Sequence, residues 1–264
     1  MKIKLNRDEL LRGIQTVGNV VSTKATLPIL SNMLLEAKDD ILKLNATDLD
    51  IGISCELPVH NLEQGAITIP AKKFSDIIRE LPAGDVVIYA RKNNQIEIEG
   101  INCRFKLNGL PKEEFPKFPE FKDKDAVLIK QADLKEMIRL TSFAVSYEES
   151  RYVLNGILLE IAGDTVRMVA TDGRRLAKME KKLIQPSAKD FNIIIPIKAI
   201  AEINRSLKET GNCTIICSVN QVLFNIDGIL IATRIIEGEF PNYKQVIPKE
   251  IPIKVKVKTQ EVLA

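Results

Sequence analysis

Apolar side chains recur along this chain with two different periods, and each period predicts one kind of element. Leu10, Ile14 and Val17 follow a spacing of three and four, which places them on one face of a helix. Alternation at period two predicts strands within residues 86–98 and 222–226. The chain therefore combines helices with strands. A second helix of the first kind is expected from Leu134, Met137, Ile138 and Phe143.

Prolines mark the points where a strand passes into a further helix. Pro70 and Pro196 each end an apolar stretch, and proline is well placed at or before a helix start because its missing N–H loses little there. Helices are therefore predicted over 71–81 and 197–208. Because strands rich in Leu, Ile and Val surround these helices, the predicted fold class is α+β, with antiparallel sheets and two helices on one face of each domain.

The whole order of elements occurs twice. Residues 154–172 (LNGILLEIAGDTVRMVATD) repeat residues 30–48 (LSNMLLEAKDDILKLNATD) at an offset of 124 positions. A repeat of this length indicates a copied domain, since solenoid units span about 20–50 residues. Residues 256–263 resemble residues 4–11, which indicates the start of a third copy. The predicted domains are 1–122, 123–250 and 251–264, the last being the beginning of a third domain.

The composition is that of a soluble globular protein. Apolar residues make up 45% of the chain and charged residues 28%, and no apolar run approaches the ~20 residues that a membrane span needs. The N-terminus lacks the apolar core of a signal peptide, so a cytoplasmic location is expected. The four cysteines show no metal-binding spacing and His60 is the only histidine. Buried free thiols, no metal and no cofactor are therefore expected.

Positive charge is concentrated in the four predicted helices and their flanks. These stretches carry twelve basic and eight acidic residues, a balance of +4, whereas the net charge of the whole chain is +3. Mixed, solvated helix faces are one interpretation, because such faces are common on soluble proteins. A surface that attracts phosphates is the other, and charge alone does not choose between them.

The sequence contains no catalytic constellation. A single histidine excludes most triads and metal sites with two histidines, and neither GxGxxG nor GxxxxGK[ST] occurs. Asp48, Asp50 and Asp172 are the remaining acid–base candidates. The second copy carries Arg174 in place of Asp50, so the Thr-Asp pairs are better explained as caps of turns. We predict that the protein is not an enzyme.

Six short motifs carry a resemblance to a known family. They are LPIL (27–30), TDLD (47–50), IPAKKF (69–74), RYVLNG (151–156), VATDGRRL (169–176) and FPNY (240–243). With them the chain resembles the bacterial DNA polymerase III beta subunit, the sliding clamp. The resemblance implies three clamp domains per chain and a head-to-tail homodimer ring, whose helices line a hole for duplex DNA. It also implies tethering of the polymerase III alpha subunit, the clamp loader and other proteins with a clamp-binding motif.

The same resemblance assigns residues to three surfaces. DNA contact is expected at Lys24, Lys72, Arg151, Tyr152, Lys198 and Arg205. A peptide-binding pocket is expected at Leu154, Thr171, Gly173, Arg174, Arg175, Leu176, Pro241 and Val246. The domain-one side of a dimer interface is expected at Lys73, Ile77 and Arg104. Arg174 departs from the histidine often found in the family, which bears on the preference for partners.

Two other functions stay open at this point. A two-domain peptide-binding scaffold that forms no ring needs neither a third domain nor a basic pore, and the partial third repeat argues against it. An enzyme that uses Asp48 or Asp172 lacks the partner residues for catalysis. Because the chain ends within the third copy, we expect the full-length protein, and not this 264-residue form, to close a ring.

Overall fold

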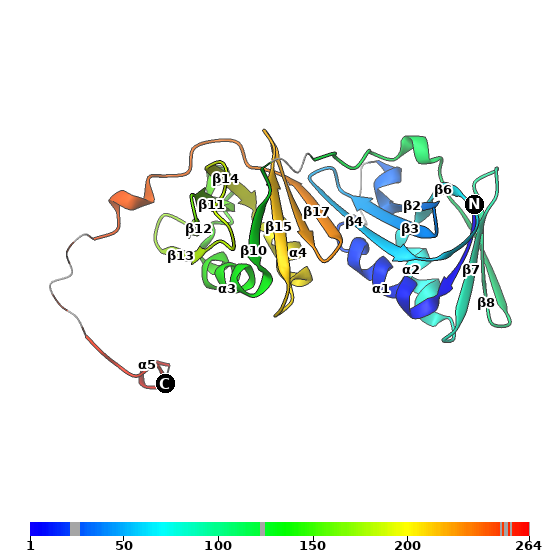
Figure 1. Cartoon of the computed structure of the whole chain (residues 1–264), viewed down its shortest axis with the longest axis horizontal. Helices are drawn as coiled ribbons and strands as arrows, with labels where there is room; N and C mark the ends of the chain where they lie inside the picture. The colour runs from blue at the N-terminus through cyan, green and yellow to red at the C-terminus, as the bar shows by residue number, and fades with distance from the viewer. Residues whose placement is uncertain (22–26, 122–124, 249, 251–252, 254, 264) are drawn as a thin grey trace.

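The computed structural model describes the chain from residue 1 to residue 263, apart from residues 22–26, 122–124, 249, 251–252 and 254. Two halves of similar architecture lie next to each other along the long axis of the molecule (Figure 1). They correspond to the two sequence copies and contain the same order of strands and α-helices, apart from the additional short strand β5 (His60–Glu63) in the first. The predicted tandem α+β fold is therefore confirmed.

The first copy runs from β1 to β9. Its strands are β1 (Lys2–Asn6), β2 (Asn32–Lys38), β3 (Ile41–Thr47), β4 (Ile51–Pro58), β5 (His60–Glu63), β6 (Gly65–Pro70), β7 (Asp85–Ala90), β8 (Gln95–Gly100) and β9 (Cys103–Asn108). Its helices are α1 (Arg7–Gly18) and α2 (Ala71–Glu80), with the short 3₁₀ helices η1 (Pro28–Ser31) and η2 (Lys112–Glu114).

The second copy runs from β10 to β17. Its strands are β10 (Val127–Lys130), β11 (Gly156–Ala162), β12 (Thr165–Thr171), β13 (Leu176–Lys182), β14 (Phe191–Pro196), β15 (Asn212–Cys217), β16 (Gln221–Ile226) and β17 (Ile229–Arg234). Its helices are α3 (Gln131–Thr141) and α4 (Ile197–Ser206), with the 3₁₀ helices η4 (Ser142–Ala144), η5 (Glu149–Leu154) and η6 (Tyr243–Gln245). The short helix α5 (Thr259–Val262) follows near the end of the chain.

Local sequence explains where α1 begins and which face it buries. The Asn6 side chain accepts hydrogen bonds from two backbone N–H groups of the first turn, at 2.9 and 3.4 Å, and so caps the helix. Leu10, Ile14 and Val17 are buried, as their spacing predicts. The corresponding prediction for α3 is wrong for Phe143, whose side chain is 56% exposed. The reason is that α3 ends before this residue, which lies in η4.

The helices α2 and α4 begin and end in the same way. Each starts directly after a proline, as predicted, and each is slightly shorter than predicted. The N–H of Leu81 donates to the Ile77 carbonyl at 3.1 Å, and the N–H of Leu207 donates to the Ile203 carbonyl at 3.1 Å. These hydrogen bonds close the last turn of each helix. The helix stops there because the backbone of both leucines is extended.

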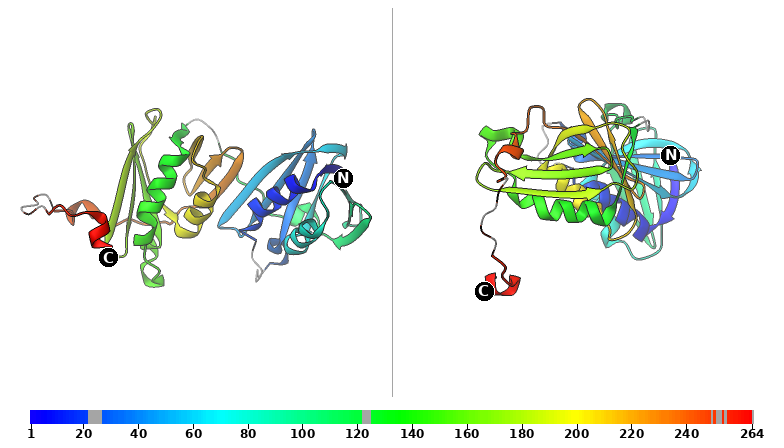
Figure 2. Two further views of the ribbon diagram at one scale, coloured as in Figure 1. Left: turned by 90° about the horizontal axis from the view of Figure 1, so that it is seen from below. Right: turned by 60° about the vertical axis from the view of Figure 1, so that its left-hand side comes forward.

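The described strands pair antiparallel throughout, as expected. They form sheets of five (β5-β1-β7-β8-β9), eight (β10-β15-β16-β17-β4-β3-β2-β6) and four strands (β13-β12-β11-β14). The eight-stranded sheet crosses from one copy to the other where β17 pairs with β4, with Ile231 opposite Ile53. The helices of both copies lie on one side of the sheets, toward the viewer in the left view of Figure 2.

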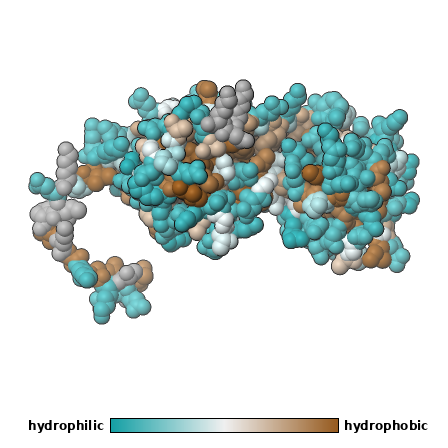
Figure 3. Space-filling model, viewed as in Figure 1, coloured by the Kyte–Doolittle hydropathy of each residue, from teal (hydrophilic) through white to brown (hydrophobic). Residues whose placement is uncertain are grey.

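The sheets bury apolar side chains on both faces. Leu35 belongs to a large cluster that runs through both copies and includes residues of α1 to α4, whereas its neighbour Leu34 points to the other face of β2. That outer face is covered by the connections that follow β9 and β17, through Phe115, Phe118 and Tyr243. Hydrophilic residues make up most of the surface that remains visible on both halves (Figure 3).

Candidate DNA and peptide interfaces

A lysine occupies the first turn of the second helix in each copy. Lys72 on α2 and Lys198 on α4 are exposed, lie two positions after equivalent prolines, and form no ion pair with a residue that the structure describes. Both helices belong to the common helix side of the molecule (Figure 2). Their charges are therefore available to an external anion. Lys24, another predicted DNA contact, lies outside the described residues.

Much of the remaining helix charge is neutralised within the helices. Arg205 Nη1 donates hydrogen bonds to the two carboxylate oxygens of Glu202, at 3.1 and 2.9 Å. Arg79 pairs with Asp76 in the same i, i+3 arrangement, at 3.1 Å. Burial raises the pKa of the Glu202 carboxyl, and the Arg205 charge opposes this rise. The positive potential of the helix side therefore depends less on Arg205 than on Lys72 and Lys198.

Arg151 connects two of the predicted surfaces. Its Nη1 donates to the Asp172 carbonyl at 3.1 Å, and its Nε lies 3.6 Å from a Glu148 carboxylate oxygen. Arg151 thus stands beside the loop after β12, which holds several of the predicted peptide-binding positions. Tyr152, the neighbouring predicted DNA contact, is 59% exposed.

The loop between β12 and β13 is held by four hydrogen bonds between its side chains and its own backbone. Thr171 Oγ1 donates to the Arg175 carbonyl at 2.6 Å and accepts from the Gly173 N–H at 3.1 Å. Asp172 Oδ1 accepts from the N–H groups of Arg174 and Arg175, at 2.9 and 3.0 Å. These two backbone donors lower the pKa of the Asp172 carboxyl. The prediction that Thr-Asp caps a turn is therefore confirmed here.

The exposed side of this loop is basic. Arg175 Nε lies 3.0 Å from Asp172 Oδ2, and its guanidinium stands 5.8 Å from the centre of the Phe143 ring. Arg174 is exposed and pairs with no acidic residue in the described part of the chain. Gly173 has a φ of +87°, and an added Cβ would lie 2.8 Å from Arg151 Nη1. The left-handed backbone therefore favours glycine here, whereas the end of the flexible Arg151 side chain could shift to accommodate a Cβ.

A group of apolar side chains, which we call the outer apolar cluster, includes Leu176, the first residue after this loop. Its members are the buried Leu158, Val169, Ile194 and Tyr243 and the partly exposed Val153, Leu176, Ile236 and Phe240. Among the predicted pocket residues, Leu176 belongs to this cluster and Leu154 is buried, at 6% exposure. Pro241 is exposed and Val246 is 70% exposed, so these two lie on the surface.

Tyr243 fastens the connection after β17 to the outer face of the second copy. Its hydroxyl donates to Glu160 Oε2 at 2.5 Å, and Lys244 Nζ lies 3.7 Å from the other oxygen of the same carboxylate. Burial, followed by the hydrogen bond to Glu160, raises the pKa of Tyr243. Sequence reasoning used Phe240 and Tyr243 only as part of a motif and missed their place in the outer apolar cluster.

The predicted dimer residues lie on α2 and β9 of the first copy. Lys73 is exposed, and Ile77 is partly buried against the large core cluster. Arg104 pairs with Glu99 of the neighbouring strand β8. β9 is the last strand of its sheet, so one edge of its backbone faces away from every described strand.

In the part of the chain that the structure describes, neither metal ligands nor cysteine thiols are gathered in a site. Within the described residues, no three His, Cys, Asp or Glu side chains are grouped so that they could hold a metal ion. Cys55 and Cys213 are buried, as predicted, whereas Cys103 and Cys217 are only partly buried. Burial raises the pKa of the Cys55 and Cys213 thiols to about 12. Across the same part of the chain, no helix has the length and apolar character needed to cross a membrane.

Two family profiles match most of this sequence. The profile of the N-terminal domain of the DNA polymerase III beta subunit matches residues 1–119, and that of the central domain matches residues 128–242. The chain belongs to the DNA polymerase III beta subunit family. The resemblance drawn from the six short motifs is therefore confirmed.

Members of this beta subunit family resemble the chain over nearly its whole length. The beta sliding clamp of Chlamydia muridarum is 34% identical over 264 residues, which is 100% of this chain and 72% of that protein. The Escherichia coli K12 beta sliding clamp is 33% identical over 251 residues, 94% of this chain and 68% of that protein. The crystal structure of the Bacillus subtilis DNA polymerase sliding clamp has a TM-score of 0.92 at 31% identity and covers 95% of this chain. The chain covers 68% of that clamp, and the similarity confirms the sliding-clamp fold.

Proposed function

We propose that this beta subunit chain functions as a DNA sliding clamp. Its two clamp domains, 1–122 and 123–250, belong to a cytoplasmic homodimer ring that encircles duplex DNA. The ring tethers the polymerase III alpha subunit, the clamp loader and other proteins with a clamp-binding motif. It catalyses no reaction and uses no cofactor. The observation that carries the proposal is the junction between the two copies.

The two copies are joined by the pairing of two strand edges, and each copy also contains the equivalent of the edge that the other copy contributes. β4 of the first copy pairs with β17 of the second. The counterpart of β4 in the second copy is β13, and the counterpart of β17 in the first copy is β9. Among the described strands, β13 pairs only with β12 and β9 only with β8. Each end of the two-domain unit thus presents one half of the junction that holds its middle together, and a closed ring of such junctions leaves none of these edges open.

The helix side supplies the surface for DNA. The exposed ammonium groups of Lys72 and Lys198 can neutralise phosphates without reading bases. Lysine is a flexible point charge, so its phosphate contacts can exchange as the duplex moves through the ring. Arg205 contributes less because its charge is paired with Glu202.

The outer apolar cluster and the loop before it supply the surface for partner peptides. Leu176 and Phe240 are partly exposed and can contact apolar anchor side chains of a peptide. Arg174 beside them is unpaired within the described residues and can bind a peptide carboxylate.

The exposed edge of β9 supplies the surface for the proposed dimer contact, and Arg104 places a charged side chain on that strand.

Topological linkage to DNA tests the proposal. The natural full-length product would be loaded by its clamp loader onto nicked circular DNA, and half of the sample would then be cut once. We expect retention on the circle and loss from the linear DNA, because a ring slides off a free end. Linear DNA with both ends blocked by a bound protein is the control and should retain the ring. Equal retention on open linear and circular DNA would refute the ring and favour the non-ring scaffold.

A further inference from the structure

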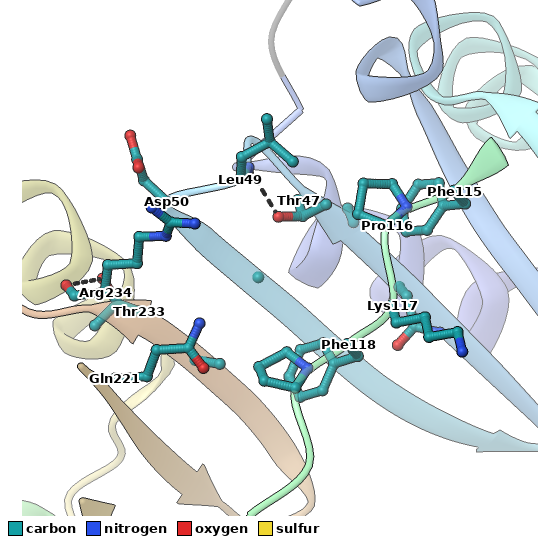
Figure 4. Close-up of a pocket in the computed structure, with 15 residues that line it drawn as sticks. Thr47, Leu49, Asp50, Phe115, Pro116, Lys117, Phe118, Gln221, Thr233 and Arg234 are labelled. Carbon is teal, nitrogen blue, oxygen red and sulfur yellow. Dashed lines mark hydrogen bonds between the residues drawn. The ribbon is translucent and has the colours of Figure 1, made fainter. Parts of the chain in front are cut away.

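A cavity of about 250 Å³ lies at the junction between the two copies. Its wall includes the end of β3 with residues of the loop after it, the connection 115–119, and Gln221, Ala232, Thr233 and Arg234 of the second copy. Figure 4 shows Pro116 and Phe118 of the connection on one side and Gln221 and Arg234 on the other. The cavity is therefore built from both copies and exists only because β4 and β17 are joined.

The loop at this cavity repeats four hydrogen bonds between side chains and backbone that also hold the β12–β13 loop of the second copy. Thr47 Oγ1 donates to the Ile51 carbonyl at 2.9 Å. It also accepts from the Leu49 N–H at 3.0 Å, as Figure 4 shows. Asp48 Oδ1 accepts from the N–H groups of Asp50 and Ile51, at 3.0 and 2.8 Å. The same four bonds hold residues 171–175. The cavity is thus the first-copy counterpart of the surface proposed to bind peptides.

The two loops differ mainly at Leu49. It occupies the position of Gly173 with a φ of +81°, a conformation that glycine adopts freely and leucine adopts only at an energetic cost. Its side chain lines the cavity and is 47% exposed. Backbone strain of this kind persists where the surrounding structure enforces it, and it is frequent at binding sites. Here it places an apolar side chain at the cavity mouth.

The cavity is lined by apolar side chains such as Leu49, Phe115 and Phe118 together with a few uncharged polar ones, and its charged residues are mainly basic. Phe118 lies close above Gly52, where an added Cβ would stand 3.2 Å from Phe118 Cε2. Lys117 and Arg234 are exposed and make no ion pair with a described residue, whereas Asp50 is the single acidic residue in the wall. The Arg234 backbone is held by its N–H, which donates to the Asp50 carbonyl at 3.0 Å. An anchor with a neighbouring carboxylate matches this arrangement.

The size of the cavity selects among occupants. Pockets for drug-sized ligands and cofactors have volumes of roughly 300–1,000 Å³, so this cavity suits one apolar side chain and part of its backbone. We infer that it is a second peptide site, which binds an extended segment carrying a Leu or Phe anchor next to an acidic residue. This inference extends the proposed peptide binding to the first copy. Each chain would then have a second site for partner proteins, located at the junction between its own two domains.

Chemical-shift mapping by NMR of the ¹⁵N-labelled 264-residue chain tests the inference. The probe is the peptide acetyl-Asp-Leu-Phe-Asp-amide, and its controls are acetyl-Lys-Leu-Phe-Lys-amide and acetyl-Asp-Ala-Ala-Asp-amide. We expect saturable shifts of the amide signals of Leu49, Gly52 and Thr233 with the probe. Both controls should bind roughly fivefold more weakly or worse, because one lacks the charge match and the other lacks the anchor.

Reversing the charge of two basic side chains at the cavity distinguishes binding at this site from binding at the proposed peptide surface of the second copy. The double variant Lys117→Glu/Arg234→Glu should weaken the shifts at Leu49 roughly fivefold or more. Lys92→Glu is the matched control, since Lys92 is exposed on the β7–β8 turn away from the cavity, and it should change nothing. The amide spectrum of each variant shows at the same time whether it is folded.

Each remaining outcome counts against the inference in a defined way. Shifts confined to residues 171–176 would overturn the second site and leave the proposed peptide surface of the second copy intact. No shift at either loop would overturn both peptide sites, while ring closure is still decided by the DNA-retention assay. Equal binding of the lysine-flanked peptide would overturn the assignment of an acidic partner.

Discussion

Replacing Gly13 by alanine is expected to destabilise the first clamp domain, although alanine favours helices. Gly13 lies on the buried face of α1, where an added Cβ would stand 2.6 Å from Leu57 Cδ1 and 2.9 Å from Leu44 Cδ1. Leu57 is only partly buried and can shift, but Leu44 has no exposed surface. Overpacking of this kind costs about 2 kcal/mol, and the better helix propensity of alanine offsets about 1 kcal/mol. The free energy of unfolding should therefore fall by about 1 kcal/mol.

Urea unfolding followed by circular dichroism measures this difference. The matched control is Gly18→Ala at the end of the same helix, where an added Cβ meets nothing within 4 Å. This control should be neutral or stabilising by up to about 1 kcal/mol. If Gly13→Ala raised the urea midpoint as much as the control does, at an unchanged m value, our reasoning about the close packing of α1 on β3 and β4 would be refuted.

Two further predictions concern charged side chains. Lys198→Gln should lower the slope of log K against log salt concentration for duplex DNA by about 0.9, measured by fluorescence anisotropy between about 50 and 200 mM salt. Arg205→Gln should change the slope less because Glu202 already pairs with Arg205, and equal effects of the two variants would contradict this. The pKa of Asp172 is lowered in the folded chain, so its charge stabilises the fold above the unfolded-state value of about 3.9, and this contribution is lost as pH falls through the folded-state pKa. Asp172→Asn should therefore weaken the fall of the urea midpoint with acidification below about pH 5, and parallel curves for the two proteins would contradict the assignment.

Local patterns were sufficient to predict the elements and their duplication. Leu10, Ile14 and Val17 lie on the buried face of α1, and Pro70 and Pro196 precede α2 and α4. Such signals act over one or two helix turns, so neighbouring residues determine them. The duplication could also be recognised without the structure, because two copies of one domain must bury the same faces and therefore keep the same apolar pattern.

Some features of the site were readable in the sequence and were missed. Glu202 precedes Arg205 by three positions, a spacing at which opposite charges on a helix pair, and this reduces the charge that Arg205 offers to DNA. Phe143 continued the apolar spacing of α3, but the helix ended first and the side chain became exposed. Periodicity predicts which face a helix buries and says little about the residue at which the helix ends.

The joining of the domains was decided by tertiary packing. Nothing in the sequence pattern of β4 or β17 identifies the other strand as its partner, because both are short, mainly apolar segments like the other strands of the chain. The hydrogen bond from Arg151 to the Asp172 carbonyl and the cavity beside Leu49 depend in the same way on segments that are distant in sequence. Bringing such segments together costs chain entropy that no single contact offsets, so these arrangements exist only once the sheets and cores of both copies have formed.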